Sequence, residues 1–161
     1  HTVVLTTSAG TIEMVLFPKA APKTVANFEK LVKSGFYDGT TFHRVIPGFV
    51  SQGGDPLSKK LKAGDQTIGT GGPGYTIPDE HGNGLKHAPG AVAMAHSSMP
   101  DSAGSQFYIA HRAITHLDGG YTIFGQVTKG FDVALKLSPS DRDGAPIDKP
   151  KSDKIIKAVL K

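Results

Sequence analysis

The chain has 161 residues, of which 38% are hydrophobic and 20% charged. This composition is typical of one globular domain spanning residues 1–161 and excludes a disordered chain. No apolar run approaches the roughly 20 residues that cross a bilayer, so no membrane association is expected.

The charge and the cysteine count restrict the function further. There is no cysteine, which excludes disulfides, thiolate chemistry and cysteine-based zinc sites. No basic segment followed by an apolar stretch suggests a secretion signal, and a cytoplasmic location is expected. The net charge is +4, but the lysines are scattered. A solvated basic surface is therefore favoured over nucleic-acid binding.

The hydrophobic pattern predicts many short strands and two helices. Apolar residues at helical spacing predict a first helix in residues 24–34 that is closed by Gly35, and residues 131–137 predict a short second helix. Between them, residues 57–85 form a long, glycine-rich loop. The expected strands are 3–6, 11–17, 42–46, 49–53, 91–95, 106–110, 122–127 and 154–160. This order predicts a mainly β fold, a closed and mostly antiparallel barrel.

Two expected strands carry polar residues among aromatic ones. Arg44 and Gln52 lie in what otherwise resembles a buried hairpin over residues 42–55, and Gln106 lies in a second aromatic strand. A buried polar group without a partner costs several kcal/mol, so these residues point to a function. We expect a groove for a ligand with both apolar and amide character. Its apolar lining would be Phe49, Tyr108 and Leu117, with Arg44, Gln52 and Gln106 at the edge.

Three other kinds of site are not favoured. The glycine run at 69–74 lacks the Gly-Lys-Ser/Thr ending of a phosphate loop. Ser105 follows Gly104, but a nucleophile elbow needs glycine two residues on either side of the serine, and Phe107 fills the second place. The seven histidines show no familiar metal-ligand spacing, so no metal is expected.

Several segments, in this order and spacing, resemble the signatures of the cyclophilins. They are Phe-His-Arg-Val-Ile-Pro-Gly-Phe at 42–49, Gln-Gly-Gly-Asp at 52–55, Gly-Ser-Gln-Phe at 104–107, Leu-Asp-Gly at 117–119 and Phe-Gly at 124–125. Residues 22–28 and 87–90 support the match, which covers residues 11–127. The resemblance implies an eight-stranded antiparallel barrel capped by two helices, and a peptidyl-prolyl cis–trans isomerase that assists protein folding.

The resemblance also implies the site and its ligands. Arg44 would stabilise the twisted amide, together with Gln52 and Phe49 as catalytic residues. Proline-containing peptides and unfolded proteins would be the partners, and no cofactor is implied. The substrate would contact Val50, Ala95, His96, Gln106, Tyr108, His116, Leu117 and Tyr121.

Four positions depart from the common cyclophilin pattern. Val50 replaces a frequent methionine, Tyr108 a phenylalanine and His96 an asparagine, and the loop after His96 is one residue longer. The Tyr108 hydroxyl must find a partner or water. His116 replaces the tryptophan that many relatives use to bind cyclosporin, so we expect weaker cyclosporin binding with isomerase activity retained.

Two alternatives remain beside the enzyme. A non-catalytic module could hold proline peptides or partner proteins as a chaperone or scaffold. A purely structural barrel would leave the polar residues of the aromatic strands unexplained. The presence of Arg44, Phe49 and Gln52 together favours the enzyme.

Overall fold

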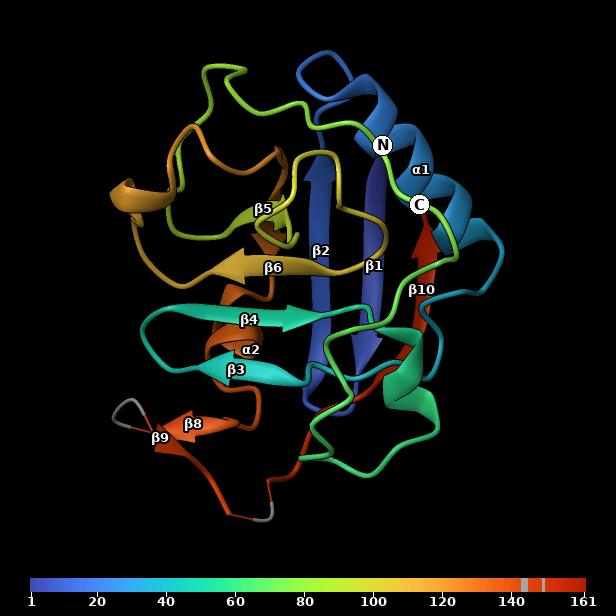
Figure 1. Cartoon of the computed structure of the whole chain (residues 1–161), viewed down its shortest axis with the longest axis vertical. Coiled ribbons are helices and arrows are strands. Elements are labelled where there is room, and N and C mark those ends of the chain that lie inside the picture. Colours follow the sequence, from blue (N-terminus) through green and yellow to red (C-terminus); the bar gives the residue numbers. More distant parts are fainter. Residues whose placement is uncertain (143–144, 149) are drawn as a thin grey trace.

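The computed structural model describes residues 1–142, 145–148 and 150–161, and its main element is one curled antiparallel sheet (Figure 1). Its eight strands follow the order β10-β1-β2-β7-β5-β6-β4-β3. Their bounds are β1 Thr2–Thr7, β2 Gly10–Leu16, β3 Arg44–Ile46, β4 Val50–Gly53, β5 Ala91–Met94, β6 Phe107–Ala110, β7 Ile123–Lys129 and β10 Ile155–Leu160. A separate pair consists of β8 (Asp141–Arg142) and β9 (Ala145–Pro146). The mainly β fold and all eight expected strands are confirmed.

The barrel is less closed than expected. No ladder joins the outer strands β10 and β3 in the described part of the chain. Instead, residues 39–42 run beside residues 153–155, through an isolated bridge between Thr41 and Lys154 and a bond from the Phe42 amide to the Asp153 carbonyl at 2.9 Å. The sheet therefore curls into a half-barrel in which β4 and β6 run across β2 (Figure 1).

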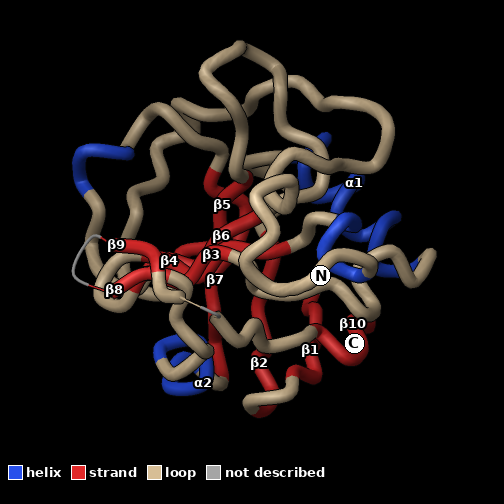
Figure 2. Tube along the Cα trace, turned by 60° about the horizontal axis from the view of Figure 1, so that its bottom comes forward, coloured by secondary structure: helices blue, strands red, loops and turns tan. Residues whose placement is uncertain are grey.

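Two α-helices cover separate parts of the sheet (Figure 2). The first, α1 (Pro22–Lys33), packs against β10, and the second, α2 (Phe131–Leu135), packs against β2. Among the described residues, no helix is long and apolar enough to cross a membrane. Short 3-10 turns, η1 (Pro56–Lys59) and η2 (Thr115–Leu117), interrupt the loops. The expected helical stripe is buried and consists of Val25, Phe28, Leu31 and Val32.

The strands under the site are buried on both faces. Along β6, Phe107 and Ile109 belong to the main core, whereas Tyr108 and Ala110 belong to a second apolar cluster. Successive side chains of a strand point to opposite faces, so one strand can serve two cores. Phe49, Leu117 and Tyr121 cover the second cluster from outside. This second cluster forms the floor of the candidate site.

Candidate active site

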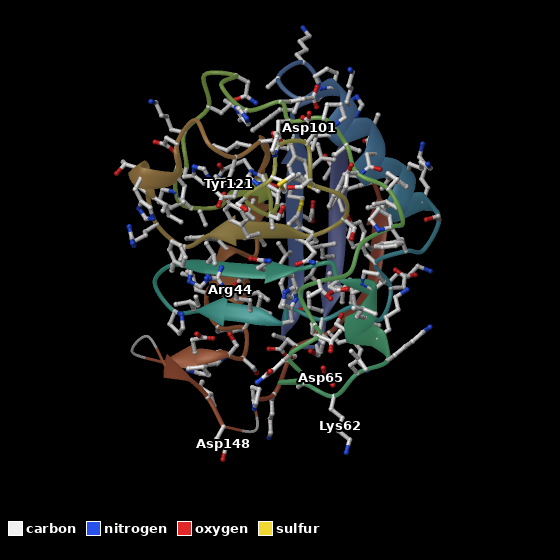
Figure 3. The ribbon with its side chains drawn as sticks, in the orientation of Figure 1. Arg44, Lys62, Asp65, Asp101, Tyr121 and Asp148 are labelled. Carbon is white, nitrogen blue, oxygen red and sulfur yellow. The ribbon has the colours of Figure 1, made fainter. Side chains whose placement is uncertain are left out.

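A row of residues across four strands builds the site. In the strand register, Arg44 on β3 lies opposite Gln52 on β4, Gln52 opposite Tyr108 on β6, and Tyr108 opposite Ala93 on β5. Cross-strand neighbours of this kind lie on one face of a sheet, about 5 Å apart. Figure 3 shows Arg44, at one end of this row, separated from Tyr121 by β4 and β6.

A cavity of about 290 Å³ lies over the row. All nine lining residues belong to the set expected from the sequence. They are Arg44, Phe49, Val50, Gln52, Ala95, His96, Tyr108, Leu117 and Tyr121. The ring of Phe49, the side chains of Val50 and Leu117 and the two tyrosine rings make most of this wall apolar, which suits a compact apolar ligand group.

The two remaining expected residues lie beside this cavity. Gln106 lines an adjoining cavity of about 500 Å³, which shares Gln52, Ala95 and His96 with the first. His116 is exposed and its ring stacks on Phe49 at 6.2 Å between centroids. The structure therefore brings all the expected site residues together, with His116 behind the wall rather than in it.

Arg44 is exposed at the rim, which corrects the expectation of an arginine inside a buried hairpin. Its position in the short edge strand β3 turns the side chain out of the core. The Arg44 Cζ lies 6.0 Å from the centroid of the Phe49 ring. Among the described residues, no carboxylate forms an ion pair with Arg44. The guanidinium therefore keeps most of its five donors for a ligand.

A chain of side-chain amides leads from Arg44 into the second cavity. Arg44 Nη1 donates to Gln52 Oε1 at 3.5 Å, and Gln52 Nε2 donates to Gln106 Oε1 at 3.1 Å. Gln106 Nε2 in turn donates to the carbonyls of Gly69 and Gly71, both at 2.9 Å. These bonds fix the side-chain amide of each glutamine in one orientation. The Gln52 oxygen faces Arg44, and the Gln106 oxygen faces Gln52.

The loop that receives Gln106 is held by the buried Asp55, which was expected as the end of the Gln-Gly-Gly-Asp motif but not as a site residue. Its carboxylate accepts hydrogen bonds from the backbone amides of Leu57, Gly69 and Gly71, at 2.8, 2.5 and 3.1 Å. A Cβ at residue 71 would overlap Asp55 Oδ1, so only glycine fits there. The glycine run at 69–74, unsuited to nucleotides, thus forms a wall of the groove. In the sequence, only the length of the loop indicated that this segment contributes to a site.

The Ala95–His96 segment presents backbone groups to the groove. The Ala95 N–H is already taken, because it donates to the Gln106 carbonyl at 3.0 Å. Within the described residues, no backbone bond is made by the Ala95 carbonyl or the His96 N–H. His96 is fixed by stacking on Tyr121 at 4.3 Å and by a contact of Nε2 with the Gly120 carbonyl at 3.0 Å.

Tyr108, on the floor, has the hydroxyl partner that its burial requires. Its oxygen lies 2.6 Å from His87 Nε2, and burial raises the pKa of this tyrosine. The ring therefore stays a neutral phenol. His87 and Asp118, which complete this contact, were not expected at the site, although both lie in segments that matched the cyclophilin pattern.

In the part of the chain that the structure describes, no group of three or more histidines and carboxylates could hold a metal ion. The geometry is that of an antiparallel half-barrel with a small, largely apolar cavity and an exposed arginine at its rim. Such a site can bind an apolar ring and place donors against the polar group next to it.

Comparison with known proteins identifies the family. Residues 2–160 match the family model described as cyclophilin type peptidyl-prolyl cis-trans isomerase/CLD. The peptidyl-prolyl cis-trans isomerase B of Bacillus subtilis is 55% identical over 131 residues, covering 81% of this chain and 85% of its own length. A peptidyl-prolyl cis-trans isomerase of Synechococcus elongatus is 50% identical over 141 residues, 88% of each chain.

The fold agrees with that assignment. The crystal structure of a Cryptosporidium parvum cyclophilin type isomerase, obtained in the presence of the dipeptide Ala-Pro, superposes with a TM-score of 0.83 and 34% identity. The match covers 100% of this chain and 99% of the other. The chain belongs to the cyclophilin family, and the enzyme class expected from the resemblance, peptidyl-prolyl cis–trans isomerase, is confirmed.

Proposed function

We propose that this enzyme accelerates rotation about X-Pro bonds in flexible or unfolded chains, and so assists protein folding, with Arg44 as the residue that lowers the barrier. The observation that carries this proposal is an exposed guanidinium at the rim of an apolar cavity, with no ion-pair partner among the described residues. The cavity lining would take the proline ring. The presence of Ala-Pro with the Cryptosporidium relative supports a proline-containing ligand.

The barrier to be lowered comes from amide resonance. Rotation of a peptide bond costs about 18–20 kcal/mol, because the planar amide shares double-bond character between carbon and nitrogen. In the twisted state the prolyl nitrogen regains its lone pair and accepts hydrogen bonds better. A donor fixed at that place favours the twisted state over both planar ones, which is differential binding of the transition state.

Arg44 has the properties this role requires. It is always charged and presents a planar fork that can donate to the nitrogen or hold the neighbouring carbonyl. Gln52 accepts from Nη1 and keeps the fork directed over the cavity. A millionfold acceleration needs only about 8 kcal/mol. The free groups of Ala95 and His96 would pair with the substrate backbone, a mode of recognition that tolerates many sequences.

A coupled proteolysis assay on a short Ala-Pro peptide tests the proposal. Wild-type protein should shorten the slow phase of cleavage, and Arg44→Ala should restore it nearly to the uncatalysed rate while its thermal unfolding stays unchanged. A wild-type protein that binds the peptide but does not change this phase would instead be the non-catalytic binding module.

A further inference from the structure

Three polar side chains form a hydrogen-bonded relay beneath the floor of the cavity, which we call the Tyr108–His87–Asp118 relay. The Tyr108 hydroxyl lies 2.6 Å from His87 Nε2, and His87 Nδ1 lies 2.8 Å from Asp118 Oδ1. The backbone N–H of His87 also donates to Asp118 Oδ1, at 2.7 Å. The His87 side chain is fully buried, and its ring is parallel to the Tyr108 ring, within 2°.

The chemistry of the partners gives the relay one direction. Hydrogen bonds from the backbone and the ring of His87 lower the pKa of Asp118, so its carboxylate is ionised and only accepts. Nδ1 of His87 must therefore carry a proton. In the neutral ring, Nε2 is then an acceptor, and the Tyr108 hydroxyl donates to it.

The relay joins the floor of the cavity to its wall. Tyr108 belongs to β6, whereas Asp118 directly follows Leu117, the last residue of η2. Both Tyr108 and Leu117 line the cavity. His87, from a third segment of the chain, holds the two together without contributing to the cavity lining itself.

We propose that His87 is a positioning residue for substrate binding, and that it acts through Tyr108. It holds the tyrosine hydroxyl in the interior, so that the floor presents an apolar ring to proline, and through Asp118 it fixes the wall residue Leu117. The inference rests on the proposed function. Without the acceptor at Nε2, the hydroxyl would be buried without a partner, and the ring would have to move toward water.

A double-mutant cycle isolates this role. Asparagine at position 87 can still donate to Asp118, but its shorter side chain offers no acceptor to Tyr108. His87→Asn should weaken binding of a short Ala-Pro peptide, measured as Kd by NMR titration, by about tenfold, the effect of losing one buried hydrogen bond. In the Tyr108→Phe background the same change should alter Kd less than about twofold, because no hydroxyl is left to lose its partner.

The outcomes separate positioning from general stability. Recovery of binding when Tyr108→Phe is added to His87→Asn supports the relay. Equal weakening of Kd by His87→Asn in both backgrounds would overturn it. If His87→Asn does not fold, ¹⁵N NMR of the His87 ring decides instead: an Nε2 resonance that shifts in Tyr108→Phe supports the relay, and an Nε2 resonance that stays unchanged overturns it. Wild-type protein that binds peptide but gives no isomerisation would contradict the proposed function while leaving this cycle readable.

Discussion

His111 links the turn that carries Phe49 to the protein interior. Its Nδ1 accepts from the Gly48 N–H at 3.1 Å, so Nε2 carries the proton and donates to Ser51 Oγ at 2.7 Å. Ser51 Oγ donates onward to the Ala134 carbonyl at 3.0 Å. A protonated ring could not accept from Gly48. Burial lowers the pKa of His111, in agreement with this arrangement.

This arrangement predicts a loss of stability in acid. A histidine with a lowered folded pKa takes up a proton more readily in the unfolded chain. Its contribution is therefore complete above the unfolded value of about 6.5 and declines as the pH falls below it. The free energy of unfolding, measured in urea at pH 7.5 and pH 5.0, should fall less for His111→Gln than for wild type. His43, whose pKa burial also lowers, is unchanged in both proteins. An equal decrease in the free energy of unfolding of the two proteins would contradict this role of His111.

His116 is the reason why we expect weaker cyclosporin binding than in relatives with tryptophan at this position. Its ring stacks on Phe49 at the edge of the cavity, where an imidazole offers a smaller apolar surface than an indole would. We predict that His116→Trp strengthens cyclosporin binding by about tenfold or more while changing kcat/KM for an Ala-Pro peptide little. Isothermal titration calorimetry gives the affinity. Nanomolar cyclosporin binding by the wild type that His116→Ala leaves unchanged would refute this account.

At the scale of elements, α1 begins without a capping residue of its own. Its cap position is Ala21, and the carboxylate of Glu80, far along the chain, accepts from the amides of Lys23 and Thr24 at 3.2 and 2.7 Å. It also accepts from Thr24 Oγ1 at 2.7 Å. A negative charge on these free N–H groups satisfies them and complements the helix dipole. The long loop is thereby fastened to the first helix.

We therefore expect Glu80→Ala to lower the free energy of unfolding by about 1–2 kcal/mol, the range for loss of a helix cap. Glu29→Ala is the matched control. Glu29 lies on α1 itself and forms a surface ion pair with His1. Its replacement removes the same charged group and should cost less than about 0.5 kcal/mol. Urea unfolding curves measure both. An equal effect of the two changes would show that Glu80 is no cap.

The elements show what could be predicted and why. Alternating or helically spaced apolar residues give a local signal, so the eight strands and the stripe on α1 were predictable from short windows. The start of α1 was not, because its cap position, Ala21, has no capping side chain and the cap comes from Glu80, a non-local partner. The course of residues 57–85 was equally unpredictable, since it depends on Asp55.

At the scale of the whole molecule, the half-barrel gives one sheet two cores. The main core fills the inner face, and the second cluster under the loops forms the floor of the site. Site residues from the β3–β4 hairpin, β6 and η2 meet on that outer face, beside β5. The order of motifs predicted that these residues would lie together, and they line one cavity. The exposure of Arg44 and the relay through His87 depend on tertiary packing, which no short window contains.

We expect Arg44 to lower the barrier to rotation, and not merely to bind the substrate. Exchange NMR on an Ala-Pro peptide measures both quantities in one sample: Kd from the shifts and the cis–trans rate from exchange peaks. Arg44→Ala should slow catalysed exchange by about 100-fold or more, as expected for loss of a transition-state donor, while Kd rises less than about fivefold. A variant whose exchange slows only in proportion to its weaker binding would contradict the claim.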